Sequence, residues 1–166
     1  MRGAKTEKVR FDNIDVIHVE RGAVISIHNG DSALIQDVTY NNIRVEDARH
    51  KLIDFAIVYG AYGTDRPTPE QRQTWRDVGG AWDGVLNVAP ADRAAFAKNR
   101  GHIRDIHVTN LQVTGGVLPF SVISGFDKNH AIENVTIEKL RYLDRPVRSA
   151  AEGKFSVSDV NGLIVR

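Results

Sequence analysis

Four segments of the chain share one pattern, in which the first, third, sixth and eighth positions are apolar and the fifth is polar. They begin at Val9, Val38, Ile106 and Val135, so their starts are 29, 68 and 29 residues apart. The middle interval is one period plus 39 residues, which a single insertion explains. A fixed period of this length is the sequence signature of stacked structural repeats.

The alternation at the start of each segment predicts a β-strand. At the fifth position the alternation slips by one residue, so we expect the strand to bend or end there. Asparagine occupies this position at Asn13, Asn42 and Asn110, and it tolerates the left-handed backbone conformation that such a corner favours. In stacked repeats these amides would form a ladder, which would end at Lys139 in the fourth segment.

A second apolar stretch follows three of the four strands, at residues 23–27, 52–57 and 118–123. A 29-residue unit with two or three short strands cannot bury its apolar face alone, so the units must stack. We therefore predict an all-β fold in one domain spanning residues 1–166. It would be a right-handed, single-stranded parallel β-helix of about four to five coils. A β-sandwich is the alternative, but it does not predict a fixed register.

Residues 61–99 differ in composition from the repeats and form the insertion. Thr68 followed by Pro69 and Gln71 is typical of a helix start, which predicts a short helix over residues 69–77. We expect a second helix over residues 92–99.

The insertion also contains both tryptophans of the chain, Trp75 and Trp82, with Arg72 and Arg76 close to the first. Long insertions on repeat proteins often build the binding face, and tryptophan can pack against the apolar face of a sugar ring. These four residues are therefore candidate substrate-binding residues. The alternative is that the tryptophans only fix the insertion to the surface of the repeats.

Charge and composition narrow the choice of partner. The 22 Lys and Arg residues nearly balance the 21 Asp and Glu residues, so we expect neither nucleic acid nor an anionic membrane as the partner. No apolar run approaches the roughly 18 residues that a membrane span needs. Cysteine is absent, which excludes disulfides and thiolate metal sites. The polar residues 1–8 do not resemble a signal peptide, so an exported protein would carry its signal elsewhere.

Two acids are weak catalytic candidates. Asp31 follows a turn, and Asp54 interrupts an apolar stretch, so together they could form an acid and base pair if both faced one groove. The alternative makes Asp31 a turn residue and Asp54 an outward-facing strand residue, as alternation alone predicts. The six histidines show no metal-ligand spacing, and we expect no metal and no cofactor.

The repeats resemble the late coils of polygalacturonase-like glycoside hydrolases, in the pectin-lyase-like superfamily. The residues that carry this resemblance are 9–16, 38–47, 101–111 and 130–138. Members of that family use Asn-x-Asp, Asp-Asp, Gly-His-Gly and Arg-x-Lys motifs and hydrolyse with two separated carboxyl groups. This chain has no Asp-Asp pair, and Ile103 follows Gly101-His102, so the resemblance carries no catalytic residue over to it.

The resemblance implies a polysaccharide or oligosaccharide partner and an extracellular or periplasmic location. We expect the chain to be the C-terminal β-helix segment of a polysaccharide-active hydrolase, inactive alone and contributing carbohydrate-binding surface. The alternatives are a non-catalytic carbohydrate-binding or assembly module and a pectate-lyase-type enzyme that uses calcium. Residues 1–8 offer no amphipathic cap, so if the chain is stable alone we predict that another copy of it covers the open N-terminal coil.

Overall fold

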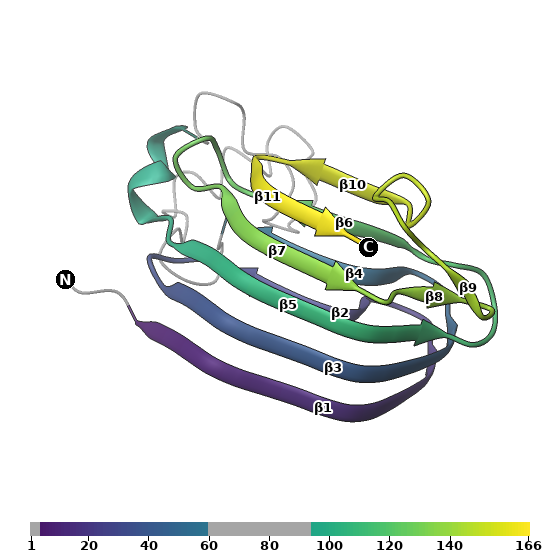
Figure 1. Cartoon of the computed structure of the whole chain (residues 1–166). Helices are drawn as coiled ribbons and strands as arrows, with labels where there is room; N and C mark the ends of the chain where they lie inside the picture. Colours follow the sequence, from purple (N-terminus) through teal and green to yellow (C-terminus); the bar gives the residue numbers. More distant parts are fainter. Residues whose placement is uncertain (1–3, 60–93) are drawn as a thin grey trace.

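The computed structural model describes residues 4–59 and 94–166, and most of this part of the chain is β-strand. Figure 1 shows the strands running side by side in layers. The strands are β1 (Lys5–Val19), β2 (Ala23–Asn29), β3 (Leu34–Ala48), β4 (Lys51–Ile57), β5 (His102–Val113), β6 (Phe120–Ser124), β7 (Ile132–Glu138), β8 (Arg141–Tyr142), β9 (Arg145–Pro146), β10 (Phe155–Ser158) and β11 (Val160–Val165).

The strands form two sheets, and the fold is all-β with mainly parallel pairing. The first sheet has the order β1-β3-β5-β7-β11, with β8 beside β5 and the short β9 antiparallel to β8. The second sheet has the order β10-β6-β4-β2, and all of its neighbouring strands are parallel. From β1 to β7, consecutive strands alternate between the two sheets, so each layer contributes one strand to each sheet.

The repeat identified in the sequence is the register of the first sheet. Val9 pairs with Val38, Val38 with Ile106, and Ile106 with Val135. The first positions of all four repeats therefore form one column across the sheet. β3 and β5 are neighbours although the whole insertion lies between them in the sequence, as the single-insertion interpretation requires.

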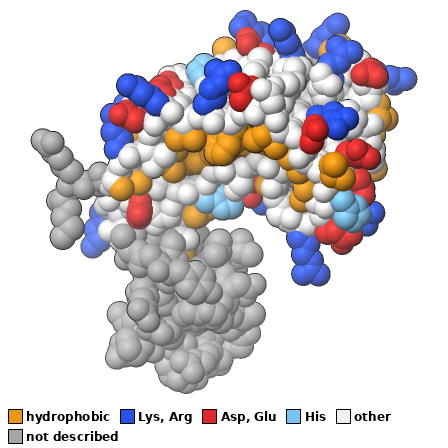
Figure 2. Space-filling view, turned by 90° about the horizontal axis from the view of Figure 1, so that it is seen from below, with side chains coloured by type: hydrophobic (Ala, Val, Ile, Leu, Met, Phe, Trp, Pro, Cys, Tyr) orange, Lys and Arg blue, Asp and Glu red, His pale blue; other side chains and the backbone are white. Residues whose placement is uncertain are grey.

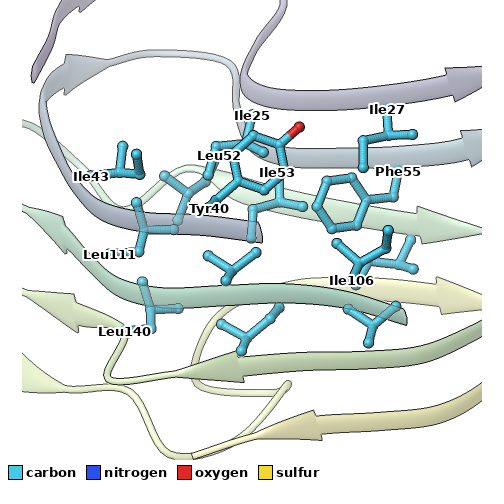
Figure 3. Close-up of a cluster of buried hydrophobic side chains, with 14 of the residues drawn as sticks. Ile25, Ile27, Tyr40, Ile43, Leu52, Ile53, Phe55, Ile106, Leu111 and Leu140 are labelled. Carbon is cyan, nitrogen blue, oxygen red and sulfur yellow. The ribbon is translucent and has the colours of Figure 1, made fainter. Parts of the chain in front are cut away.

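The core lies between the two sheets (Figure 3). Apolar residues of β3, β4 and β5 point into it, and each repeat adds one layer of aliphatic side chains. The aromatic members are Phe126, Phe55, which is fully buried, and Tyr40, which stacks on Phe55 at 6.3 Å between ring centroids. Burial raises the pKa of Tyr40 to about 12. The largest fully buried side chains include Leu52, Ile53, Phe55, Ile103, Ile106, Leu111, Ile123, Ile132, Ile137 and Leu140.

The long strands bend where the alternation of the sequence slips. Asn13, Asn42, Asn110 and Lys139 all have positive φ, between 54° and 57°. A second column of bends crosses the same sheet five residues earlier, at residues 8, 37, 105 and 134. Asp and Asn fill three of these four positions, because their short polar side chains tolerate the left-handed conformation.

The structure can be compared with the second strands and the helices that the sequence predicts. The three second strands are present, but the last one begins at Phe120 rather than at residue 118. Of the helix expected over residues 92–99, residues 94–99 form short helical turns that end in a 3₁₀ helix at Ala97–Asn99, and residues 92 and 93 lie outside the described residues. The helix expected over residues 69–77 lies outside the described residues. Within the described part of the chain, no helix is long and apolar enough to cross a membrane.

Candidate functional site

The corner asparagines of the first three repeats are joined by side-chain hydrogen bonds. Asn42 Nδ2 donates to Asn13 Oδ1 at 2.6 Å, and Asn110 Nδ2 donates to Asn42 Oδ1 at 2.8 Å. Gln112 Nε2 then donates to Asn110 Oδ1 at 3.1 Å, so the last amide oxygen is also satisfied. This ladder runs across the strands on the outer side of the first sheet, and its role is structural.

We expect Asn42→Ala to lower the free energy of unfolding by about 2 kcal/mol. The substitution removes two hydrogen bonds and places an alanine in the left-handed conformation, which disfavours side chains without a local polar group. Asn42→Gly is the matched control, since glycine accepts this conformation but has no amide. Urea unfolding of both variants separates the two effects, and an alanine variant as stable as the wild type would contradict the assignment.

Charged side chains also connect neighbouring repeats on this outer side. Arg44 holds Asp15 with two hydrogen bonds of 2.8 and 3.1 Å, and Arg49 reaches Glu20 at 3.1 Å. The bond from Arg44 holds the pKa of the Asp15 carboxyl below its usual value. All four side chains are exposed, so each pair stabilises the fold only slightly.

The second sheet carries a different kind of cluster, formed by His28, Lys51 and Asp54. Lys51 Nζ lies 2.6 Å from Asp54 Oδ2, and His28 Nε2 lies 3.1 Å from the same oxygen. Asp54 is only 7% exposed, whereas the His28 side chain is about half exposed at 48%. Asp54 Oδ1 accepts no hydrogen bond from the described residues. We call these three residues the Asp54 cluster.

Strand alternation places the Asp54 cluster on the outer face of the second sheet. Ile53 and Phe55, on either side of Asp54, point into the core, so Asp54 points away from it. The aspartate is nevertheless covered, with His28 and Lys51 lying against it. Sequence alternation predicted its direction and missed its partners.

Small side chains border the cluster on the same face. Ser26 lies opposite Asp54 on β2, and Ala56 lies opposite Ser124 on β6. Ser124 Oγ in turn lies 2.9 Å from Ser158 Oγ on β10. Four neighbouring strands thus present short side chains here, three of them with hydroxyl groups that can donate and accept hydrogen bonds.

An aromatic side chain lies at the end of this face. Phe120 pairs with Lys51 across the β4–β6 register and is 41% exposed. The His50 ring meets it edge-on, with 5.7 Å between centroids. An exposed aromatic ring beside a buried carboxylate and a lysine provides both an apolar contact and charged hydrogen-bonding groups.

Asp31, the other acid singled out in the sequence, belongs to a turn. Its Oδ1 accepts a hydrogen bond from the Ala33 amide at 2.8 Å, and its own amide donates to Asn29 Oδ1 at 3.3 Å. The Asp31 carboxylate thus closes its own loop, while the Asp54 carboxylate bonds to Lys51 and His28. The structure supports the turn interpretation of Asp31.

Some expected residues cannot be placed, and others were missed. Trp75, Trp82, Arg72 and Arg76 lie outside the described residues. His28 and Lys51 were not singled out in the sequence as partners of Asp54. The signal was available, because aligning the second strands would have placed Ser26 beside Asp54 and His28 within diagonal reach of it.

Short motif spacings need the structure to be interpreted. Asn-x-Asp occurs at residues 13–15 and 29–31, and Arg-x-Lys occurs at residues 49–51. In the first, Asn13 belongs to the asparagine ladder and Asp15 bonds to Arg44. In the second, Asn29 Oδ1 accepts a hydrogen bond from the Asp31 amide, and the Asp31 carboxylate bonds to the Ala33 amide. The third contributes Lys51 to the Asp54 cluster, while Arg49 bonds to Glu20 and Asp47.

Within residues 4–59 and 94–166, no group of three or more metal-ligating side chains comes together. Comparison of the chain with protein-family models, with curated proteins and with solved structures finds no match. The interpretation of the site therefore depends on its geometry.

Proposed function

We propose that the chain is a parallel β-helix that supplies carbohydrate-binding surface to a polysaccharide-active, polygalacturonase-like glycoside hydrolase. Two observations support the β-helix: strands β1 to β7 alternate between two parallel sheets, and equivalent residues pair across the repeats. The proposal assigns no catalytic acid to this chain, because the Asp31 carboxylate bonds to the Ala33 amide within its own turn, whereas the Asp54 carboxylate is held by Lys51 and His28.

The observation that carries the binding function is the Asp54 cluster beside short side chains and Phe120. Charged groups held by one another are pre-oriented hydrogen-bonding partners for sugar hydroxyls, and Asp54 Oδ1 has capacity to accept one more bond. Phe120 offers an apolar surface to the C–H face of a sugar ring.

The test is binding of the 166-residue chain to a panel of neutral and uronate polysaccharides, measured by calorimetry. We expect Asp54→Asn to weaken binding about tenfold, since it removes one charge-assisted hydrogen bond at the site. Glu46→Ala is the control, because Glu46 is an exposed carboxylate on β3, in the other sheet. Circular dichroism checks that both variants are folded.

Three results would contradict the proposal. The first is the absence of binding to any polysaccharide of the panel. The second is an equal loss of affinity in Asp54→Asn and Glu46→Ala, which would place binding elsewhere. The third is turnover by the chain alone, with hydrolysis indicating catalytic acids in this segment and calcium-dependent elimination indicating a lyase.

A further inference from the structure

β1 is an open edge of the first sheet. It has 15 residues, and among the described strands it pairs only with β3. Figure 1 shows it as the lowest strand of the stack. With respect to the described residues, one side of its backbone therefore presents N–H and C=O groups that pair with no strand, which is a template for pairing with another chain.

The same edge exposes apolar side chains that other layers bury. Phe11 is 39% exposed, whereas Tyr40, its register partner on β3, is 7% exposed and stacks on it at 4.8 Å. Val9 and Ile14 are half-buried, although their partners on β3 belong to the buried core. Figure 2, seen from below, shows a hydrophobic stripe across this end of the molecule. An apolar end beside an unpaired strand needs a cover.

We propose that, where the 166-residue chain stands alone, a second copy of it covers this end, with the two β1 strands paired antiparallel about a two-fold axis that passes between Asp12 and Asn13. A two-fold axis makes the contact self-complementary and closed, so two copies satisfy each other. The opposite end of the stack does not fit equally well, because β11 has only 6 residues and would leave most of β1 uncovered.

The apolar side chains meet one another in this register. Counting outward from the axis sets Phe11 opposite Ile14 of the second copy, and Val9 opposite Val16. Each of these residues faces the core, because each pairs in register with a buried residue of β3. Directly opposite residues of an antiparallel pair share one face of the sheet, so the register joins the two cores.

Part of the charge pattern of the outer face is also complementary. Lys8 lies opposite Ile17 and Asp12 lies opposite Asn13, but three opposite pairs combine a basic with an acidic residue, and each of these occurs twice about the axis. These pairs are Lys5 with Glu20, Glu7 with His18, and Arg10 with Asp15 of the second copy.

Neighbouring registers lose this match. A shift of one residue sets core-facing side chains opposite outward-facing ones. A shift of two residues in one direction sets Asp12 opposite Asp15 and Glu7 opposite Glu20, so like charges meet. A shift of two in the other direction sets the apolar Phe11 opposite Asp12.

The bends of β1 fit the same arrangement. They lie at Lys8, Asn13 and His18, at equal intervals along the strand. In the proposed register each bend falls within one residue of a bend in the second copy. The two strands therefore curve together, with an irregularity of one residue at each bend of the kind that a β-bulge absorbs.

Sedimentation equilibrium of the chain tests the proposal. We expect a dimer of twice the 18.4 kDa chain mass. Phe11→Asp should raise the dimer dissociation constant about a hundredfold, because the axis places each substitution in the interface twice. Val117→Asp is the control, since Val117 is also an exposed apolar residue but lies in the β5–β6 connection, outside the proposed interface. A monomeric wild type, or equal effects of the two variants, would overturn the proposal.

Disulfide cross-linking tests the register, and because the chain has no native cysteine, only the introduced cysteines can form disulfides. In the variant Arg10→Cys/Asp15→Cys, each cysteine lies opposite its counterpart in the second copy, within the roughly 7 Å that a disulfide requires between Cα atoms. The two cysteines of one chain are about 16 Å apart along the strand, too far to bond. We expect covalent dimers from the double variant and none from either single variant. Efficient cross-linking of a single variant, or none of the double variant, would refute this register.

Discussion

Phe55→Ala is expected to lower the free energy of unfolding by about 3–5 kcal/mol, the range found for removing a buried aromatic ring. Phe55 is fully buried between the two sheets, and in the second sheet it pairs in register with Ile27 and Ile123, which are also buried. Its loss would leave a cavity beneath Tyr40 that neighbouring strands, fixed on both sides by ladder hydrogen bonds, cannot close.

Urea unfolding followed by far-ultraviolet circular dichroism measures this effect as a lower midpoint with an unchanged slope. Phe120→Ala, on the neighbouring strand β6, is the control because its ring is 41% exposed and leaves no cavity. A loss below 1 kcal/mol for Phe55→Ala would show that the core is less tightly packed than the structure indicates.

The second large effect is expected at Gly101, which precedes β5. A Cβ atom at this position would lie 1.8 Å from the carbonyl oxygen of Ala33, so the Ala33 backbone would have to move. That oxygen accepts hydrogen bonds from the His102 amide at 3.0 Å and from Asn29 Nδ2 at 2.7 Å. Gly101→Ala would break this junction, and we expect a loss of about 3 kcal/mol.

Gly115→Ala is the matched control. Its nearest neighbour would be Glu46 Cγ at 3.8 Å, an ordinary contact, and its φ lies outside the left-handed region. We expect the thermal midpoint to fall by several degrees for Gly101→Ala and to change little for Gly115→Ala. Similar midpoints for the two variants would mean that the Ala33 backbone can move aside without lowering the stability of the fold.

The first sheet could be predicted from the sequence because its information is local. Alternation marked the strands, the slip at Asn13 and its equivalents marked the bends, and the equal spacing of the repeats gave the register. The second column of bends had a signal too, in the Asp or Asn that precedes Val38, Ile106 and Val135.

The candidate site was harder to predict because its information is not local. Asp54 stood out as a polar residue within an apolar stretch, but its environment depends on a histidine 26 positions earlier, on the neighbouring strand β2. Asp31 illustrates the opposite case, because its carboxylate bonds to an amide two residues away. A turn residue can be explained from a short segment, whereas a buried ion pair requires the neighbouring strand.

The pairing of β3 with β5 has a consequence for how such a chain can change over time. The two strands meet in the same register as β1 and β3, although 68 rather than 29 residues separate their paired positions. Strand pairing therefore constrains where the connection after β4 begins and ends, and leaves its length free. Evolution could lengthen, shorten or exchange that connection, and so change binding specificity, while all of the strand pairs stay in register.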